Sequence, residues 1–344
     1  MPRVAAFSGS PIAFGCKAMW DREYLNEPLF FWQGGIKLRQ SGIAVDIPRR
    51  QPLAFVSHAH SDHIARHELV ICTPATAALY QLRLGRRPVR ELPFNEPVEI
   101  GGTRITLLPA GHCLGSAMLL VELKEHSLLY TGDFRLGPSA TAEVAEVPPA
   151  EVLIMESTYG HPRYRLPPRD TAIAMLKERV EWACEKDLLP VIFAYSLGKA
   201  QEVTAILNDL SLPVYVHKKI HEVHEVYRRF GIGLGKYEVF SPNVRPPAVV
   251  IMPPGATITL GRQPIFTIAV TGWAIDPRTR FWWGVDEAVP LSDHADFDGL
   301  LSLVEMVSPR RVYCLHGPEI FVEHLRSRGW DAHSLGRPTQ YRLF

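Results

Sequence analysis

A short segment rich in histidine and aspartate is the first place in this 344-residue chain where chemistry can be expected. It reads SHAHSDH at residues 57–63 and directly follows an apolar run that is typical of a buried strand. Side chains two residues apart on extended backbone point to the same side, so His58 and His60 can bind one metal ion. Asp62 and His63 follow a turn and can reach a second ion. Nitrogen and oxygen donors at this spacing suit a pair of divalent metals, and the alternative is a solvated polar loop.

Other polar residues follow apolar runs further along the chain. His112 stands in the run GHCLGSA at 111–117, and Asp133 stands in TGD at 131–133. Together with SHAHSDH and the upstream Asp46, these motifs occur in the order found in the metallo-β-lactamase fold, which the chain therefore resembles. The resemblance implies a structural role for Asp46 and metal-ligand roles for His112 and Asp133. Without it, either ligand would more simply be read as a hydrogen-bonded residue of the core.

Three later motifs resemble the β-CASP nucleases, the nucleic-acid-cutting branch of this fold. They are ESTYG with Glu156, SDHAD with His294 and LHG with His316. Within the branch, the runs AYSLGKAQ at 194–201 and LSDHAD at 291–296 resemble the bacterial ligase-associated DNA exonucleases most. The resemblance extends over nearly the whole chain from about its thirtieth residue.

The resemblance implies two divalent metal ions, with zinc favoured and manganese able to support activity. The first ion would be bound by His58, His60 and His112. The second would be bound by Asp62, His63 and His316, with Asp133 bridging the two. His316 has an alternative role, in which it supports a ligand without binding the ion itself.

The same resemblance implies a hydrolytic mechanism for a phosphodiester. A hydroxide that bridges the two ions would attack the phosphorus, with Asp62 orienting or deprotonating the water. His294 would act as the general acid, and Glu156 would keep it protonated because a neighbouring carboxylate raises the pKa of a histidine. The simpler alternatives are a surface or capping carboxylate for Glu156 and a polar residue at a helix start for His294.

Several donors near these motifs could bind phosphate groups of a substrate. Ser196 and Lys199 stand where a predicted strand meets a predicted helix, and the free N–H groups of a helix N-terminus suit a phosphate. Ser157 and Thr158 would add hydroxyl donors beside the metals. A helix cap with a solvated lysine is the alternative for the first pair.

Two further groups could contact nucleic acid, but a structural role is the preferred interpretation for each. The first is a basic run that we expect to be a solvated turn, made of Arg83, Arg86, Arg87 and Arg90. The second is a set of tryptophans that could stack on unpaired bases but are expected to pack in the core. These are Trp273, Trp282 and Trp283.

The elements that must position these residues change in pattern along the chain. Before about residue 163, short apolar runs predict strands, with one helix over 74–85. Strands then alternate with helices, which is typical of a parallel βα layer, and short strands return near the C-terminus. We therefore predict an α/β protein, a metallo-β-lactamase αββα sandwich with an inserted β-CASP domain. The predicted parts are 1–162 (with an N-terminal extension at 1–30), the insertion at 163–288, and 289–344.

Composition narrows the function classes. The chain has 37 Lys and Arg against 36 Asp and Glu, and this formal net charge of +1 excludes a histone-like protein that binds nucleic acid by bulk charge. Its 5 cysteines include no CxxC pair, which argues against a disulfide scaffold and favours the cytoplasm. We expect neither a signal peptide nor a membrane span, since no apolar run approaches the roughly 18 residues that a span requires.

The leading functional prediction is a metal-dependent DNA exonuclease in repair. Its partner would be nucleic acid, with DNA favoured over RNA, single-stranded or at ends, and with a functional link to an ATP-dependent DNA ligase. An RNA-processing exo- or endonuclease is the alternative, because a histidine at the position of His316 is usual in RNA-cutting members of the branch. A small-molecule metallo-hydrolase and a non-catalytic scaffold are the remaining alternatives.

Overall fold

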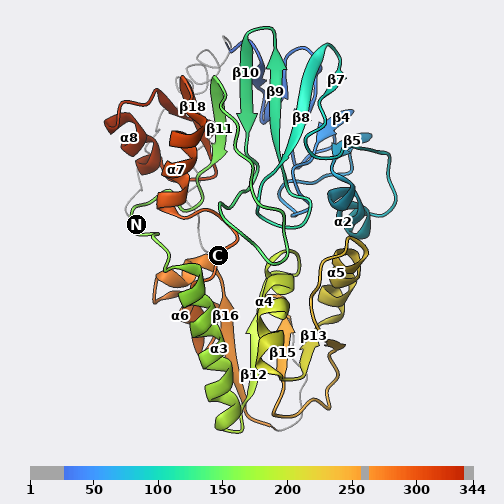
Figure 1. Ribbon diagram of the computed structural model, residues 1–344, viewed down its shortest axis with the longest axis vertical. Coiled ribbons are helices and arrows are strands. Elements are labelled where there is room, and N and C mark those ends of the chain that lie inside the picture. Colours follow the sequence, from blue (N-terminus) through green and yellow to red (C-terminus); the bar gives the residue numbers. More distant parts are fainter. Residues whose placement is uncertain (1–26, 257–262, 337–344) are drawn as a thin grey trace, which may run out of the picture.

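The computed structural model describes residues 27–256 and 263–336, which form three β-sheets with helices packed around them (Figure 1). The predicted N-terminal extension lies outside the described residues except for 27–30, and so does Cys16. In Figure 1, two sheets form the upper part of the molecule and the third forms the lower part.

The first two sheets pack face to face as a sandwich. The first has the strand order β1 (Phe30–Trp32), β2 (Ile36–Leu38), β3 (Ala44–Val45), β4 (Leu53–Phe55), β5 (Leu69–Cys72) and β6 (Val89–Glu91). The second has the order β19 (Ala332–Ser334), β18 (Arg311–Leu315), β11 (Val152–Glu156), β10 (His126–Tyr130), β9 (Ala117–Leu123), β8 (Thr103–Pro109) and β7 (Val98–Ile100). Their facing side chains share one core, in which Phe55 and Ile71 belong to the same cluster as Leu119 and Tyr313.

Helices cover the outer faces of this sandwich. On the second sheet, α7 (Phe297–Val307) and α8 (Glu319–Ser327) form a core with the outer side chains of the strands. By the first sheet, α2 (Pro74–Leu84) begins after Thr73, whose hydroxyl accepts the N–H of Thr76 as an N-cap. The architecture is the predicted αββα sandwich.

The third sheet is parallel throughout and comes from the middle of the chain. Its strand order is β14 (Glu238–Val239), β13 (Val214–Val216), β15 (Val249–Met252), β12 (Leu189–Phe193), β16 (Ile265–Val270) and β17 (Glu287–Val289). The accompanying helices are α3 (Arg169–Glu185), α4 (Lys199–Leu207), α5 (Lys218–Arg229) and α6 (Thr279–Trp283), with two 3₁₀ turns, η2 (Asn208–Leu210) and η3 (Gly272–Ile275). The predicted alternation of strand and helix is present in this layer.

Two local predictions were wrong. The chain after residue 289 contains α7 and α8, where only short strands were expected. A capping side chain at Asp296 and buried Phe297, Leu300 and Val304 mark α7 as an amphipathic helix. Asp170 precedes the apolar residues Ile173 and Leu176 and is therefore predicted from the sequence to cap a helix, but α3 begins at Arg169 with Pro168 at the N-cap position.

Among the described residues, no helix is both long enough and apolar enough to cross a membrane.

Candidate metal centre and cleft

The histidine-rich loop leaves the sandwich directly after β4, and Asp46 holds it in place. The Asp46 carboxylate accepts hydrogen bonds from the backbone N–H of Ser57 at 2.7 Å and from the hydroxyl of Tyr130 at 2.8 Å. Its second oxygen also lies 2.9 Å from Nδ1 of His63. Asp46 therefore anchors both ends of the loop, which is the structural role that the resemblance implies.

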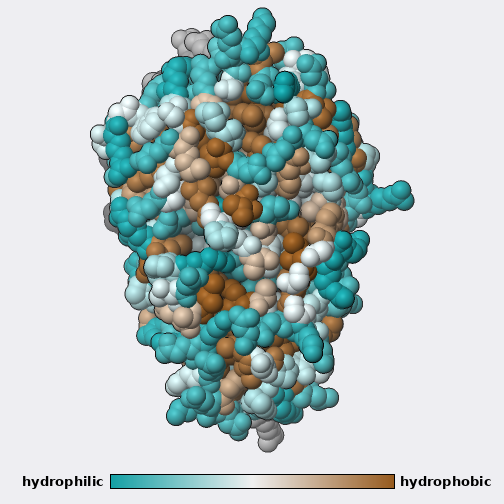
Figure 2. Space-filling model, viewed as in Figure 1, coloured by the Kyte–Doolittle hydropathy of each residue, from teal (hydrophilic) through white to brown (hydrophobic). Residues whose placement is uncertain are grey.

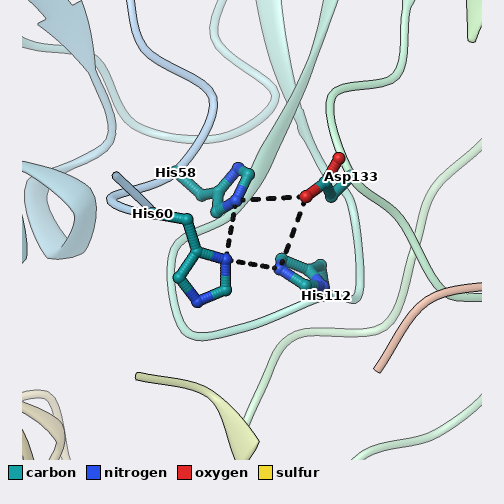
Figure 3. A group of neighbouring side chains, drawn as sticks. All are labelled: His58, His60, His112 and Asp133. Atoms are coloured by element: carbon teal, nitrogen blue, oxygen red, sulfur yellow. Dashed lines mark hydrogen bonds and ion pairs between the residues drawn. The ribbon is translucent and has the colours of Figure 1, made fainter. Parts of the chain in front are cut away.

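Four donor atoms from three segments converge on one point. Nδ1 of His60 lies 3.0 Å from Nε2 of His58 and 3.1 Å from Nε2 of His112. Oδ2 of Asp133 is 3.4 Å from Nε2 of His58. Figure 3 shows the four side chains facing a common centre, and all four donor atoms lie within 4.8 Å of one another.

Glycine is required where the chain brings Asp133 to this centre. Gly132 has a φ of 55°, and a Cβ at this residue would lie 2.7 Å from the Cβ of Ser57. Any other residue would therefore be strained and would also clash with the loop that carries the histidines.

Each of the three imidazoles has one ring nitrogen that faces the common centre and one that faces away from it. Hydrogen bonds of the nitrogens that face away indicate that those facing the centre are free to bind a cation. His60 Nε2 lies 3.1 Å from the carbonyl oxygen of Leu197, and His112 Nδ1 lies 2.9 Å from that of Asp293. A carbonyl only accepts, so each of these nitrogens carries the proton and the inward nitrogen keeps its lone pair. His58 Nδ1 is 2.9 Å from the hydroxyl of Ser57. The donor set therefore fits a divalent metal ion.

Burial keeps these imidazoles neutral, as metal ligands must be. Loss of hydration lowers the pKa of His58 and of His60, and lowers that of His112 to about 3. A cluster of three neutral imidazoles and one carboxylate binds a cation far more readily than three imidazolium groups would.

The residues predicted to bind a second ion lie beside the first set, but they are farther apart and include an exposed side chain. Nε2 of His63 is 3.4 Å from Oδ2 of Asp133 and 3.7 Å from Oδ2 of Asp62. The Asp62 side chain is 74% exposed, and the ring of His316 lies 6.0 Å from that of His63. These residues all line the same cleft, and Asp133 lies between the two sets.

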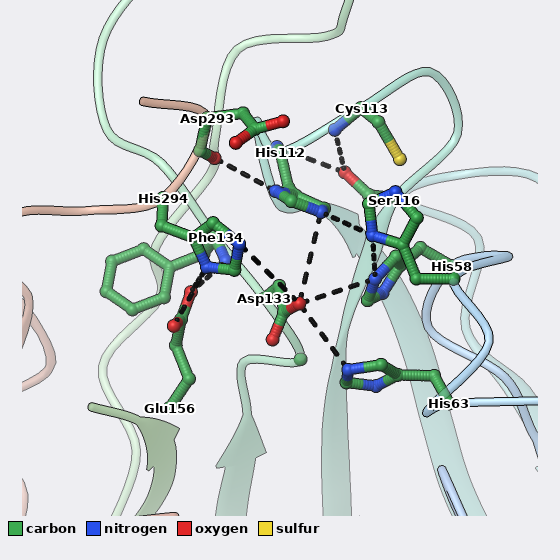
Figure 4. Close-up of polar contacts among 12 residues, drawn as sticks. His58, His63, His112, Cys113, Ser116, Asp133, Phe134, Glu156, Asp293 and His294 are labelled. Carbon is green, nitrogen blue, oxygen red and sulfur yellow. Dashed lines mark hydrogen bonds and ion pairs between the residues drawn. The ribbon is translucent and has the colours of Figure 1, made fainter. Parts of the chain in front are cut away.

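Glu156 and His294 form a hydrogen-bonded pair next to the metal ligands (Figure 4). His294 Nδ1 is 2.9 Å from Oε1 of Glu156, which also accepts the backbone N–H of Phe134 at 2.9 Å. Nε2 of His294 faces Oδ2 of Asp133 at 4.0 Å. Burial opposes the charge on His294, but the carboxylates of Glu156, Asp133 and Asp293 together outweigh it and raise the pKa of His294 to about 10.

The four predicted phosphate contacts differ in their surroundings. Thr158 and Ser196 line the cleft, whereas Ser157 is buried and donates its hydroxyl to the carbonyl of Leu315 at 2.9 Å. Lys199 is only 1% exposed, and its Nζ lies 2.9 Å from Oε2 of Glu202. Lys199 also lines the cleft, so the structure counts only against Ser157, and the assignment of Thr158, Ser196 and Lys199 as phosphate contacts remains a prediction.

The cleft runs between the sandwich and the third sheet and has a volume of about 1100 Å³. Its metal end is lined by the ligands and His294. Its other walls include Tyr159, Tyr195 and Trp273, with Arg83 and Lys219 on α2 and α5. Arg83, which was expected on a solvated turn, lines the cleft and donates to the carbonyl of Ala59 at 2.6 Å.

The expectation that the three tryptophans pack in the core was wrong. Trp273, Trp282 and Trp283 are all partly exposed, in η3 and α6. The ring of Trp273 lies 4.7 Å from that of Tyr159, on the wall of the cleft. α6 is a helix of only 5 residues, too short to bury its aromatic side chains on one face.

Sequence reasoning missed the groups that orient the ligands from outside. The carbonyls of Leu197 and Asp293 hold His60 and His112, but a backbone carbonyl carries no signal in the sequence. Asp293 itself could have been singled out from the sequence, because it directly precedes His294 in the SDHAD motif.

Comparisons with known proteins agree with this arrangement. Residues 30–186 match the model of the "Beta-lactamase superfamily domain", and residues 287–335 match that of the "Zn-dependent metallo-hydrolase RNA specificity domain". A solved structure of a protein of unknown function from Enterococcus faecalis is 17% identical with a TM-score of 0.55, covers 76% of this chain and 75% of its own, and is similar in fold.

Two curated relatives cover most of the chain. A "Probable DNA ligase" of Opitutus terrae is 41% identical over 90% of this chain and 31% of its own length. The "5' exonuclease Apollo" of Gallus gallus is 27% identical over 75% of this chain and 57% of its own length. The chain thus spans about a third of the first relative and little more than half of the second. With its sandwich, its cluster of candidate metal ligands and the two matched domain models, the chain belongs to the metallo-β-lactamase superfamily and, within it, to the β-CASP branch.

Proposed function

We propose that the protein is a metal-dependent phosphodiesterase that acts as a DNA exonuclease in DNA repair. The observation that carries this proposal is the Glu156–His294 pair, held 4.0 Å from the carboxylate of the ligand Asp133. Metal ligands alone would suit many hydrolases. A protonated imidazole aimed at the same centre adds the acid that the leaving oxygen of a phosphodiester requires.

The residues of the chain divide the chemistry between them. His58, His60 and His112 would hold one divalent ion through neutral nitrogens, and Asp62, His63 and His316 would hold a second, with Asp133 shared between the two sets. Zinc is the favoured ion, with manganese able to support activity. Bound ions would neutralise phosphate charge and lower the pKa of water.

Asp62 is the exposed carboxylate at the mouth of this set, where it can orient an attacking water. His294 carries its transferable proton on Nε2, because Nδ1 is held by Glu156. The proton therefore points toward the metal ligands, where the alkoxide would leave.

The size and position of the cleft favour a polymer as the substrate. At about 1100 Å³ the cleft is at the upper limit of the roughly 300–1,000 Å³ that is typical of small-molecule pockets. Its lining residues come from both the sandwich and the third-sheet layer, which suits an extended strand. These features argue against a small-molecule hydrolase, and the complete set of ligand residues argues against a non-catalytic scaffold.

The preference for DNA rests on relatives. The name of the first relative, a probable DNA ligase, favours DNA, and the name of the second, a 5′ exonuclease, favours strand ends. The first name also supports the proposed functional link to an ATP-dependent DNA ligase. The alternative is an RNA exo- or endonuclease, which the "RNA specificity domain" match and His316 favour.

The remaining assignments belong to the same proposal. We place the inserted domain at 163–288, between sandwich segments at 1–162 and 289–344, because the third sheet draws all its strands from 189–289. We place the protein in the cytoplasm because Cys72, Cys113, Cys184 and Cys314 are all free thiols.

The test is a matched cleavage series with end-labelled DNA and RNA single strands that carry 5′-phosphate or 5′-hydroxyl ends, in Zn²⁺ or Mn²⁺. Stepwise shortening of DNA is the expected result, and the label that is released first gives the polarity. Cleavage of RNA alone would replace DNA repair with the RNA alternative. Full activity in His294→Ala would favour a small-molecule type of site instead.

A further inference from the structure

An aromatic wall leads outward from the metal centre. Tyr195 is 48% exposed, lines the cleft, and stands two residues before Leu197, whose carbonyl holds the ligand His60. The ring of Tyr195 meets the ring of Trp283 edge-on, with their centroids 6.2 Å apart. Tyr195 therefore joins the cleft to α6.

Beyond Tyr195, an aromatic side chain of α6 is largely exposed on the surface. Phe281 in α6 is 69% exposed, and the guanidinium of Arg280 lies 4.6 Å above its ring. We call the set Tyr195, Phe281 and Trp283 the aromatic rim. Large exposed aromatic side chains beside a cleft mark a binding surface, because their hydration is unfavourable unless a partner covers them.

The charges near the rim select among partners. Arg280 makes no ion pair with a carboxylate among the described residues, so its charge is available to an anionic partner. On the same segment the guanidinium of Arg278 lies 5.0 Å above the ring of Trp282, although it also pairs with Asp276. Aromatic rings interleaved with guanidinium groups are the surface on which unpaired bases stack while the backbone phosphates are neutralised.

The surface view is consistent with this position. Figure 2 shows hydrophobic patches interrupting the hydrophilic surface over the middle of the molecule, where the sandwich and the third sheet meet. A second row of rings, Tyr159 and Trp273, lies on the inner wall, with Tyr159 6.1 Å from the ring of His294. Tyr195 and this inner pair thus line the same cleft as the reaction centre.

From these contacts we infer that the aromatic rim stacks on bases of an unpaired nucleic-acid strand whose scissile phosphate lies at the metal centre. The inference rests on the proposed function and adds the state of the substrate to it. A paired strand keeps its bases stacked in the duplex and cannot offer their faces to Tyr195. The rim therefore selects single-stranded ends.

The test compares strands with and without bases. Steady-state cleavage is measured on a natural single strand and on a strand of equal length that is abasic at the nucleotides nearest its end, in DNA and in RNA. Wild-type protein should show a lower KM for the natural strand, by about 5- to 100-fold, which is the range for stacking of one base. Tyr195→Leu should abolish this preference, whereas Tyr195→Phe, which keeps the ring, should retain it.

Two more variants complete the design. Phe281→Ala should weaken the preference by raising the KM for the natural strand. Phe230→Ala is the matched control, because Phe230 is 41% exposed at the end of α5 and does not line the cleft. It should behave as wild type.

The outcomes separate this inference from the proposed function. Wild type that cleaves natural and abasic strands equally would overturn the inference about the aromatic rim and leave the proposed nuclease function in place. An intact preference in Tyr195→Leu would do the same. No cleavage of any strand would overturn the proposed function itself. A change of oligomeric state in Phe281→Ala with an unchanged KM would show that this face pairs copies of the chain, and would also overturn the inference.

Discussion

The imidazole of His112 donates from Nδ1 to the backbone carbonyl of Asp293 at 2.9 Å, across 181 residues of sequence. The residue that precedes the proposed acid His294 thus orients a metal ligand. The Asp293 carboxylate, in turn, lies 3.7 Å from Nζ of Lys199 at the start of α4. Asp293 therefore links the candidate ligand His112 and the proposed acid His294 to Lys199 in the third-sheet layer.

Lys199 is expected to stabilise this arrangement. Its Nζ also lies 2.9 Å from Glu202, so Lys199→Met would leave Asp293 without this cation and Glu202 paired with Arg169 alone. Removal of one partner from a buried pair costs about 3–5 kcal/mol, and we expect a loss of this order in the free energy of unfolding. Chemical denaturation measures it, and Lys177→Met, which breaks the exposed pair with Asp209, serves as the control. An unchanged unfolding midpoint for Lys199→Met would refute the role.

His294→Ala and Glu156→Gln should impair the chemical step without loss of metal. General acids contribute about 10²- to 10⁴-fold, so kcat on single-stranded DNA should fall by this factor in His294→Ala. Glu156→Gln should lower kcat less, because the imidazole remains but loses the carboxylate that raises its pKa. Metal content, measured by elemental analysis of each purified variant, should match wild type. A lost metal ion would reassign His294 from acid to ligand.

His224 should make the protein less stable in mild acid. Burial lowers the pKa of His224 to about 4, against 6.5 in the unfolded chain. Between these values the unfolded chain binds a proton that the folded protein does not. The free energy of unfolding therefore falls as the pH drops from 6.5 toward 4, by up to about 3 kcal/mol from this residue.

The variant His224→Asn isolates that contribution. Its stability relative to wild type should be lowest above pH 6.5 and should approach that of wild type near pH 4.5, as followed by denaturant unfolding at each pH. His333, which pairs with Asp331 on the surface, provides a control in His333→Asn. A constant difference between His224→Asn and wild type over this range would contradict the assignment.

The side chains that gather at the candidate metal centre could be expected from the sequence because they come in short motifs. His58, His60 and His63 are neighbours in the chain, and each follows from the spacing within one loop after β4. The pairing of Glu156 with His294 spans 138 residues and was available only through resemblance to a family. The parallel pairing of β11 with β18, which sets Glu156 opposite Leu315, brings Glu156 beside the motif of His316.

The sequence could not predict how exposed a side chain is or which side chain a backbone carbonyl faces. The three tryptophans looked like core residues by type, but Trp273 lies in the 3₁₀ turn η3, and Trp282 and Trp283 lie in α6, a helix of 5 residues in which only Thr279 is buried. Lys199 looked like a solvated or phosphate-binding residue, although two acidic partners bury it. By contrast, α7 could have been found, because Asp296 and the apolar residues after it carry a capping and helical pattern.

The most direct test of the central claim is metal-dependent cleavage of end-labelled single-stranded DNA by wild type, His60→Ala and Asp62→Ala. Wild-type activity should disappear with a chelator and return with Zn²⁺ or Mn²⁺. Both variants should lose cleavage while their circular dichroism spectra and unfolding midpoints stay close to those of the metal-free wild type. Turnover that persists in either variant, or that is unaffected by the chelator, would contradict the assignment of this cluster as the metal centre of a nuclease.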